Sequence, residues 1–146
     1  MFLGAHLALG LIIGKITGNY LIALAGSLAI DLDHLIPYIK HKIIYSSDKF
    51  WKTITDPRDK YGDQRNYLHS FIAWIAISFI ISVFSNHVGF VFSIAYLGHL
   101  IVDSLDGSNF FPFYPLSKIN FKGPIKYFSE SEFLFTLVLF IIFFLS

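Results

Sequence analysis

The amino-acid sequence predicts an all-α fold, a polytopic membrane helix bundle of four to five helices with metal-ligand candidates at its cytoplasmic end. Three observations predict it. Of the 146 residues, 55% are hydrophobic and only 14% are charged, against roughly 25% charged residues in an ordinary soluble domain. Long apolar segments recur between polar loops. Acidic and histidine residues gather where successive segments meet one membrane face. The length suits a single integral-membrane domain over residues 1–146.

Five apolar segments define the expected helices. A polar turn separates the first two segments, and a short link joins the third and fourth into a hairpin. At 1.5 Å per residue the third segment reaches about 28 Å, close to the hydrocarbon thickness of roughly 30 Å. The first segment is shorter and could be tilted, re-entrant or packed inside the bundle. The segments cover residues 2–14, 20–36, 67–85, 88–105 and 130–146.

The loops predict the orientation in the membrane. Residues 37–66 and 106–129 flank the hairpin, so both loops lie on the same side. They hold ten of the eleven Lys and Arg residues, and the remaining one is Lys15. By the positive-inside rule these loops are cytoplasmic, which predicts a multi-pass protein of the cytoplasmic (inner) membrane. The net charge of only +1 argues against a nucleic-acid partner.

Ionisable residues gather at that same face, although they come from helices that run in opposite directions. Among the acidic and histidine residues, the opposite end of the bundle holds only His87. An aspartate at the centre of a membrane helix costs roughly 2.5–3.5 kcal/mol on insertion scales. Asp31 and Asp103 lie among aliphatic residues, so we expect them to face a shared polar cavity. The gathered residues are His6, Asp31, Asp33, His34, His69, His99, Asp103, Glu130 and Glu132.

His99 and Asp103 are four residues apart and share one helix face, with side chains about 5–6 Å apart. An imidazole and a carboxylate held this way form a pair of metal ligands. In a soluble helix a surface hydrogen bond would explain the pair more simply, but its apolar surroundings and the Asp-x-Asp-His motif favour a metal. Mixed His and carboxylate ligands suit a divalent ion, Zn²⁺ first, with Mn or Fe as alternatives. The predicted ligands are His6, Asp31, His34, His69, His99 and Asp103.

Three further residues are predicted to take part in catalysis. Asp33 points away from Asp31 on an unbroken helix, and turns inward only if the backbone unwinds before Pro37. Asp33 or Glu130 would act as general base. Arg65 would anchor a phosphate, or would serve only as a topogenic charge.

The residues in combination resemble the YdjM-like (LexA-binding) family of inner-membrane proteins, which are described as metal-dependent hydrolases. The likeness covers most of the chain. Two departures stand out: Gln64 lies where the family usually has His before Arg, and Ile30 lies where a Pro is common. The motifs are Asp31-Leu32-Asp33-His34, Arg65-Asn66-Tyr67-Leu68-His69-Ser70 and His99-Leu100-Ile101-Val102-Asp103, after an early His6. The resemblance implies a metal site built from His6, Asp31, His69, His99 and Asp103.

The leading interpretation is a membrane-embedded metal-dependent hydrolase that acts on a phosphoester or lipid-like substrate at the cytoplasmic interface. Its expected partners are membrane lipid and an amphiphilic or phosphoester substrate. Proton or cation transport is one alternative. Because the outer half of the bundle has no ladder of polar residues, transport would need a homo-oligomer or a hidden access path. The other alternative is a non-catalytic adaptor, in which a metal staples the helices and residues 37–66 recruit a soluble partner.

Overall fold

The computed structural model describes residues 1, 3–56, 65 and 67–146, and the regular structure within them is helical, as predicted. Four α-helices and a 3₁₀ helix come from the first half of the chain, and three α-helices from the second. The elements are α1 (Leu3–Thr17), α2 (Tyr20–Leu28), η1 (Ala29–His34), α3 (Leu35–Lys40), α4 (Ser47–Thr55), α5 (Phe71–Phe84), α6 (Asn86–Ser104) and α7 (Glu130–Leu145).

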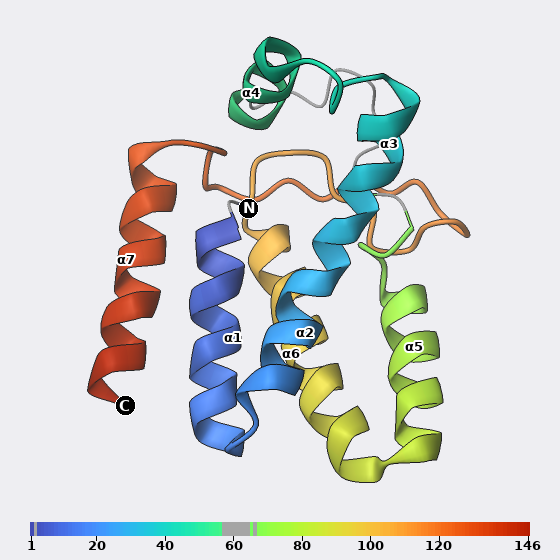
Figure 1. Ribbon diagram of the computed structural model, residues 1–146, viewed down its shortest axis with the longest axis vertical. Coiled ribbons are helices and arrows are strands. Elements are labelled where there is room, and N and C mark those ends of the chain that lie inside the picture. Colours follow the sequence, from blue (N-terminus) through green and yellow to red (C-terminus); the bar gives the residue numbers. More distant parts are fainter. Residues whose placement is uncertain (2, 57–64, 66) are drawn as a thin grey trace.

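Helices α1, α2, α5, α6 and α7 run side by side, and α4 lies across one end of them together with the loop that follows α6 (Figure 1). Helix α2 packs against α1 and α6, α5 packs against α6, and α7 packs against α1. The centre of the bundle is therefore α1, α2 and α6. A cluster of small and branched side chains fills the space between these three helices: Ile13, Ala23, Val91 and Ala95.

Helices α2 and α6 approach closely because Gly26 lies between them. A Cβ at Gly26 would lie 2.6 Å from the carbonyl oxygen of Phe92 and 2.9 Å from the Cβ of Ala95. Small residues at such crossings let backbones pack directly in lipid, where packing replaces the hydrophobic effect as the driving force. The crossing sets the distance between α2 and α6, the two helices whose ends carry the polar cluster.

The second apolar segment is one continuous helical stretch. It tightens into the 3₁₀ helix η1 in the region before Pro37, where the sequence did not decide whether the helix unwinds. A 3₁₀ helix has three residues per turn, so side chains at i and i+3 eclipse each other. Asp31 and His34 therefore lie on the same side, with His34 Nε2 3.4 Å from Asp31 Oδ1. Asp33 turns into the protein and is only 2% exposed. The tightening occurs without a proline at Ile30.

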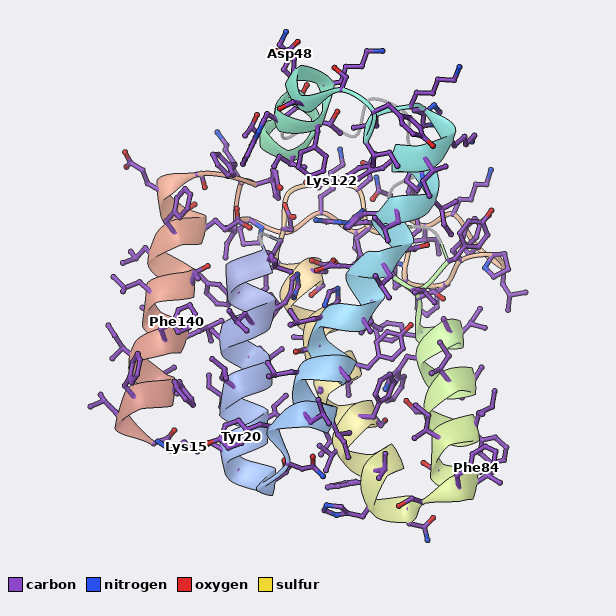
Figure 2. All side chains as sticks on the ribbon, in the orientation of Figure 1. Lys15, Tyr20, Asp48, Phe84, Lys122 and Phe140 are labelled. Carbon is purple, nitrogen blue, oxygen red and sulfur yellow. The ribbon has the colours of Figure 1, made fainter. Side chains whose placement is uncertain are left out.

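Two helical stretches are long and apolar enough to cross a membrane within the described residues: Tyr20–Lys40 and Asn86–Ser104. Helices α1 and α5 are apolar but shorter. The expected four to five spans therefore stay a prediction. The outer faces of α5 and α7 nevertheless present large apolar side chains, such as Phe84, which projects from the bundle and is 85% exposed (Figure 2). Lys15 lies at the opposite end of the bundle from Lys122 (Figure 2), which agrees with the predicted separation of the loops.

Helix α4 lies inside the segment that the sequence analysis interpreted as a loop. Ser46 caps it, since its side chain accepts a hydrogen bond from the backbone of Lys49. Phe50 and Ile54 lie on one face, four residues apart, and charged residues such as Asp48 lie elsewhere on the helix. Its polar composition concealed the helix, although the cap and the apolar spacing are both visible in the sequence. Residues 57–64 and 66, including Gln64 and the rest of the proposed adaptor loop, lie outside the described residues.

Other helix boundaries shift by a few residues. Helix α5 begins at Phe71, and the side chain of Ser70 caps it by accepting from Ala73 N. His69 therefore lies just before this helix instead of within it. Ser129 is the N-cap residue of α7. The Glu132 carboxylate, three residues after this cap, accepts a hydrogen bond from Phe128 N.

We expect Gly26→Val to lower the free energy of unfolding by about 1–3 kcal/mol, because the new side chain overpacks the crossing of α2 and α6. Ala25→Val is the control, since Ala25 is exposed on the same helix and receives the same β-branched side chain. Thermal unfolding followed by circular dichroism measures both. Equal effects of the two variants would contradict the close-packing account.

Candidate metal centre

The polar cluster forms where three helices and one loop meet, at the end of the bundle below α4. Helix α1 supplies His6, η1 supplies Asp31, and the loop before α5 supplies His69. His99 and Asp103 come from the last turns of α6. His6, His69 and His99 are all fully buried. The structure thus brings together residues that are up to 97 positions apart in the sequence.

Three donor atoms converge at the centre of this cluster. His69 Nε2 lies 3.3 Å from His99 Nε2. Asp103 Oδ2 lies 3.4 Å from His69 Nε2 and 3.5 Å from His99 Nε2. Ligands of a tetrahedral zinc ion with bonds of roughly 2.0–2.1 Å are about 3.3 Å apart. The three edges of this triangle therefore suit one metal ion, with a coordination position left for water or substrate.

Hydrogen bonds on the far side of each imidazole determine what the Nε2 atoms can do. His99 Nδ1 lies 2.7 Å from the carbonyl oxygen of Ser27, which can only accept a hydrogen bond. His69 Nδ1 lies 3.3 Å from the Asp33 carboxylate. Both Nδ1 atoms therefore donate, and this orients both Nε2 lone pairs toward each other. Such an arrangement requires a cation between the two nitrogens, either a shared proton or a metal ion.

The electrostatics of His69 agree with that requirement. Burial acts to lower the pKa of His69, but hydrogen bonds to Asp31 and Asp33 and the charge of Asp103 together raise it above the usual value. The surroundings of this imidazole thus favour a positive charge. The same carboxylates would attract a divalent ion, which would displace the proton of the imidazole on binding.

A second group of ligand candidates borders the first. Asp31 Oδ1 lies 3.6 Å from His69 Nε2 and 3.8 Å from His99 Nε2. His34 lies on the other side of Asp31. The rings of His6 and His99 stack with centroids 3.8 Å apart. The overlapping groups that could each hold an ion are His6, Asp31 and His99; Asp31, His34 and His69; and His69, His99 and Asp103.

Several buried atoms of the cluster have no hydrogen-bond partner within the described structure. They include both ring nitrogens of His6 and Oδ2 of Asp103. His6 Nε2 lies 3.2 Å from Asp103 Oδ1, without the angular geometry of a hydrogen bond. Buried polar groups are almost always hydrogen-bonded, so these atoms are suited to bind a water or an ion. The donor set and its unsatisfied atoms both fit a divalent metal.

Asp33 holds the loop that carries His69. Its Oδ2 accepts hydrogen bonds from the backbone nitrogens of Tyr67 and Leu68, each at 2.9 Å, as well as contacting His69. The hydroxyl of Tyr96 donates to the carbonyl oxygen of Leu68. This carboxylate is therefore occupied in fixing the loop and the His69 tautomer, and its predicted role as a base is untested.

Arg65 is a buried cation at the edge of the cluster. Its Nη2 donates to Asp106 Oδ2 at 2.9 Å, and its Nε lies 3.8 Å from Asp103 Oδ2. Burial opposes its charge, but Asp103 and Asp106 raise the pKa of Arg65 further above its usual value. The Met1 nitrogen also contacts both aspartates. Among the described residues, Arg65 Nη1 has no hydrogen-bond partner, so this guanidinium has an unsatisfied donor beside the predicted ligands.

A cavity of about 600 Å³ opens between the cluster and α4. Asp31, His34 and Arg65 lie in its wall, and most of the remaining wall is apolar. Glu130 is exposed at the start of α7 and is not among the residues that line this cavity. Of the nine predicted site residues, the structure gathers eight around the cluster and places Glu130 apart from it.

Sequence reasoning missed three contributors to the site. Asp106 lies beyond the end of α6, so the helical spacing that pairs His99 with Asp103 no longer applies there. It nevertheless accepts a hydrogen bond from Arg65. The Ser27 carbonyl is a backbone group and carries no residue-specific signal. Tyr127, which donates to the Ile54 carbonyl at 2.7 Å, comes from a loop whose path the sequence pattern does not reveal.

A family model described as YdjM inner membrane protein matches residues 1–146, the whole chain, and the chain therefore belongs to this family. The family assignment agrees with the expected inner-membrane location. No curated protein and no solved structure shows a significant match. The metal-dependent hydrolase and LexA-binding parts of the resemblance remain predictions.

We expect purified protein to retain stoichiometric zinc after dialysis, and His69→Ala or His99→Ala to lose it, because each change removes one of the three converging donors. Elemental analysis measures the metal content. His87→Ala is the matched control, since His87 is an exposed histidine at the other end of the bundle. Zinc retained in folded His69→Ala and His99→Ala protein would contradict the site.

Asp33→Asn should weaken metal binding by roughly 10–100-fold without removing a ligand of the central triangle, because it loosens the partner that orients His69. A competition titration with a chelating dye measures the affinity. Asp48→Asn provides the control, since Asp48 is an exposed carboxylate on α4. An unchanged affinity in Asp33→Asn would show that this hydrogen bond does not tune the ligand.

Proposed function

We propose that this member of the YdjM family is a membrane-embedded metal-dependent hydrolase that acts on a phosphoester or lipid-like substrate at the cytoplasmic interface. One observation carries the proposal: the lone pairs of His69, His99 and Asp103 converge on one point. Beside them, Asp31 and His34 line a largely apolar cavity. A purely structural cluster would instead satisfy its buried polar atoms internally.

The proposed cofactor is a divalent ion, Zn²⁺ first, with Mn or Fe as alternatives for this mixed donor set. His69, His99 and Asp103 would hold it, and His6, Asp31 and His34 offer further ligands for a second ion. When bound, such an ion supplies an activated water with a pKa near roughly 7 and polarises a phosphoryl or carbonyl oxygen.

The surrounding residues support hydrolysis by positioning and by proton transfer. Asp33 and the Ser27 carbonyl hold the two imidazoles, while Asp106 and Asp103 hold Arg65. Arg65 is proposed to contact an anionic oxygen of the substrate through Nη1. Asp31 and His34 line the cavity side by side, and they are better placed to accept a proton than Asp33 or Glu130.

The proposal predicts that zinc-loaded protein in lipid nanodiscs hydrolyses a small water-soluble phosphoester, such as a nitrophenyl phosphate or its diester. Asp103→Asn should reduce the rate by ~100-fold or more, since loss of a ligand costs at least as much as loss of a residue that orients one. Product absorbance gives the rate, and His87→Ala should leave it unchanged. Folded, zinc-loaded protein that cleaves neither phosphoesters nor acyl esters would refute the proposal.

A further inference from the structure

The cavity below α4 has two chemically different ends. Asp31, His34 and Arg65 form a polar end beside the metal candidates. The rest of the wall comes chiefly from α3, α4 and the start of α7. Its apolar residues include Leu35, Tyr38, Phe50, Trp51, Ile54 and Phe133, with some polar residues such as Thr53 and Asp56 between them. At about 600 Å³ the cavity lies within the range of roughly 300–1,000 Å³ that is typical of small-molecule sites.

The polar end has an unsatisfied cationic donor. Arg65 is 9% exposed, and its Nη1 is buried without a hydrogen-bond partner in the part of the chain that the structure describes, whereas its other nitrogens face Asp103 and Asp106. A guanidinium nitrogen left unpaired in a buried site is costly, and charge-assisted hydrogen bonds to an anionic oxygen are among the strongest in proteins. The Arg65 guanidinium belongs to the wall of this end of the cavity and is therefore the group suited to bind an anion there.

The apolar end is covered by a helix with no packing core of its own. No residue of α4 is buried. The Tyr127 hydroxyl holds the helix by donating to the Ile54 carbonyl at 2.7 Å, and both residues line the cavity. The apolar face of α4, with Phe50 and Ile54, thus borders open space in which a hydrocarbon chain would be shielded from water.

We infer that the cavity binds a phosphate amphiphile, with its phosphoryl group at Arg65 and its hydrocarbon tail between α4 and the start of α7. A phosphoryl group can contact Arg65 Nη1 with one oxygen and still direct another toward His69 and His99, which a carboxylate with two oxygens does less readily. Phe50, Trp51 and Ile54 of α4 then determine tail specificity. The inference deepens the proposed function, because it names the substrate class of the same site.

Binding of a non-hydrolysable dibrominated alkyl phosphonate to protein in phosphatidylcholine nanodiscs tests this inference, because bromine quenches nearby tryptophan fluorescence. Trp51 lines the cavity and is the expected reporter, and Trp51→Phe identifies its signal. We expect saturable quenching at one phosphonate per protein, reversed by an unbrominated alkyl phosphonate. Because Arg65 acts without the metal, the quenching should persist in chelator, where no turnover occurs.

Variants locate the two ends of the site. Ile54→Asn should weaken binding by roughly tenfold or more, since it removes apolar wall area. The matched Ile39→Asn should not, because Ile39 is exposed on α3 and does not line the cavity. Arg65→Lys keeps the positive charge but has a shorter side chain, so it should weaken phosphonate binding. The dependence of affinity on the length of the hydrocarbon tail should stay the same.

Three outcomes would overturn the inference. Quenching that never saturates, with or without zinc, would mean simple partitioning into the bilayer. Displacement by an alkyl alcohol of the same length would exclude an anionic headgroup, and displacement by a fatty carboxylate with equal strength would exclude a phosphoryl preference. Hydrolysis of a soluble phosphoester with no tail binding would refute the inference alone, whereas tail binding without hydrolysis would refute only the proposed function.

Discussion

The fold depends on compensating the buried carboxylates at one end of the helix bundle. Asp33, Asp103 and Asp106 are nearly inaccessible to solvent, and an unpaired buried charge is strongly destabilising. Arg65 is the Lys or Arg side chain that pairs with them in the described structure. The imidazoles of His6, His69 and His99 face these carboxylates, and a cation shared among the imidazoles would complete the neutralisation. Folding and metal binding are therefore expected to be coupled.

The geometry of the cluster follows from backbone features some distance from the chemistry. Gly26 lets α2 and α6 approach, so the carbonyl oxygen of Ser27 reaches His99. The 3₁₀ winding of η1 then places Asp31 over His34 and buries Asp33 against the loop before α5. His69 is thus held by a carboxylate and His99 by a backbone carbonyl on the side away from the centre, as in known metal sites.

Much of this arrangement could be predicted because membrane helices impose simple rules. Apolar length predicted most helices, and the cost of burying Asp31 and Asp103 predicted that they would converge. The pattern could not predict α4, whose polar residues conceal its apolar face, nor the pairing of Arg65 with Asp106. Both depend on contacts between distant loops. The orientation of His69 and His99 also required the structure, because backbone carbonyls and tautomers leave no mark in the sequence.

The most direct test of the account is X-ray absorption spectroscopy on the zinc-loaded protein. The converging donors predict nitrogen and oxygen neighbours at roughly 2.0–2.1 Å from zinc, with the outer-shell scattering of at least two imidazoles. Loss of one imidazole contribution from the spectrum of His99→Ala would identify His99 of α6 as one of these ligands. A spectrum of hydrated zinc without imidazole scattering, from folded wild-type protein, would contradict the claim that His69, His99 and Asp103 form a metal centre.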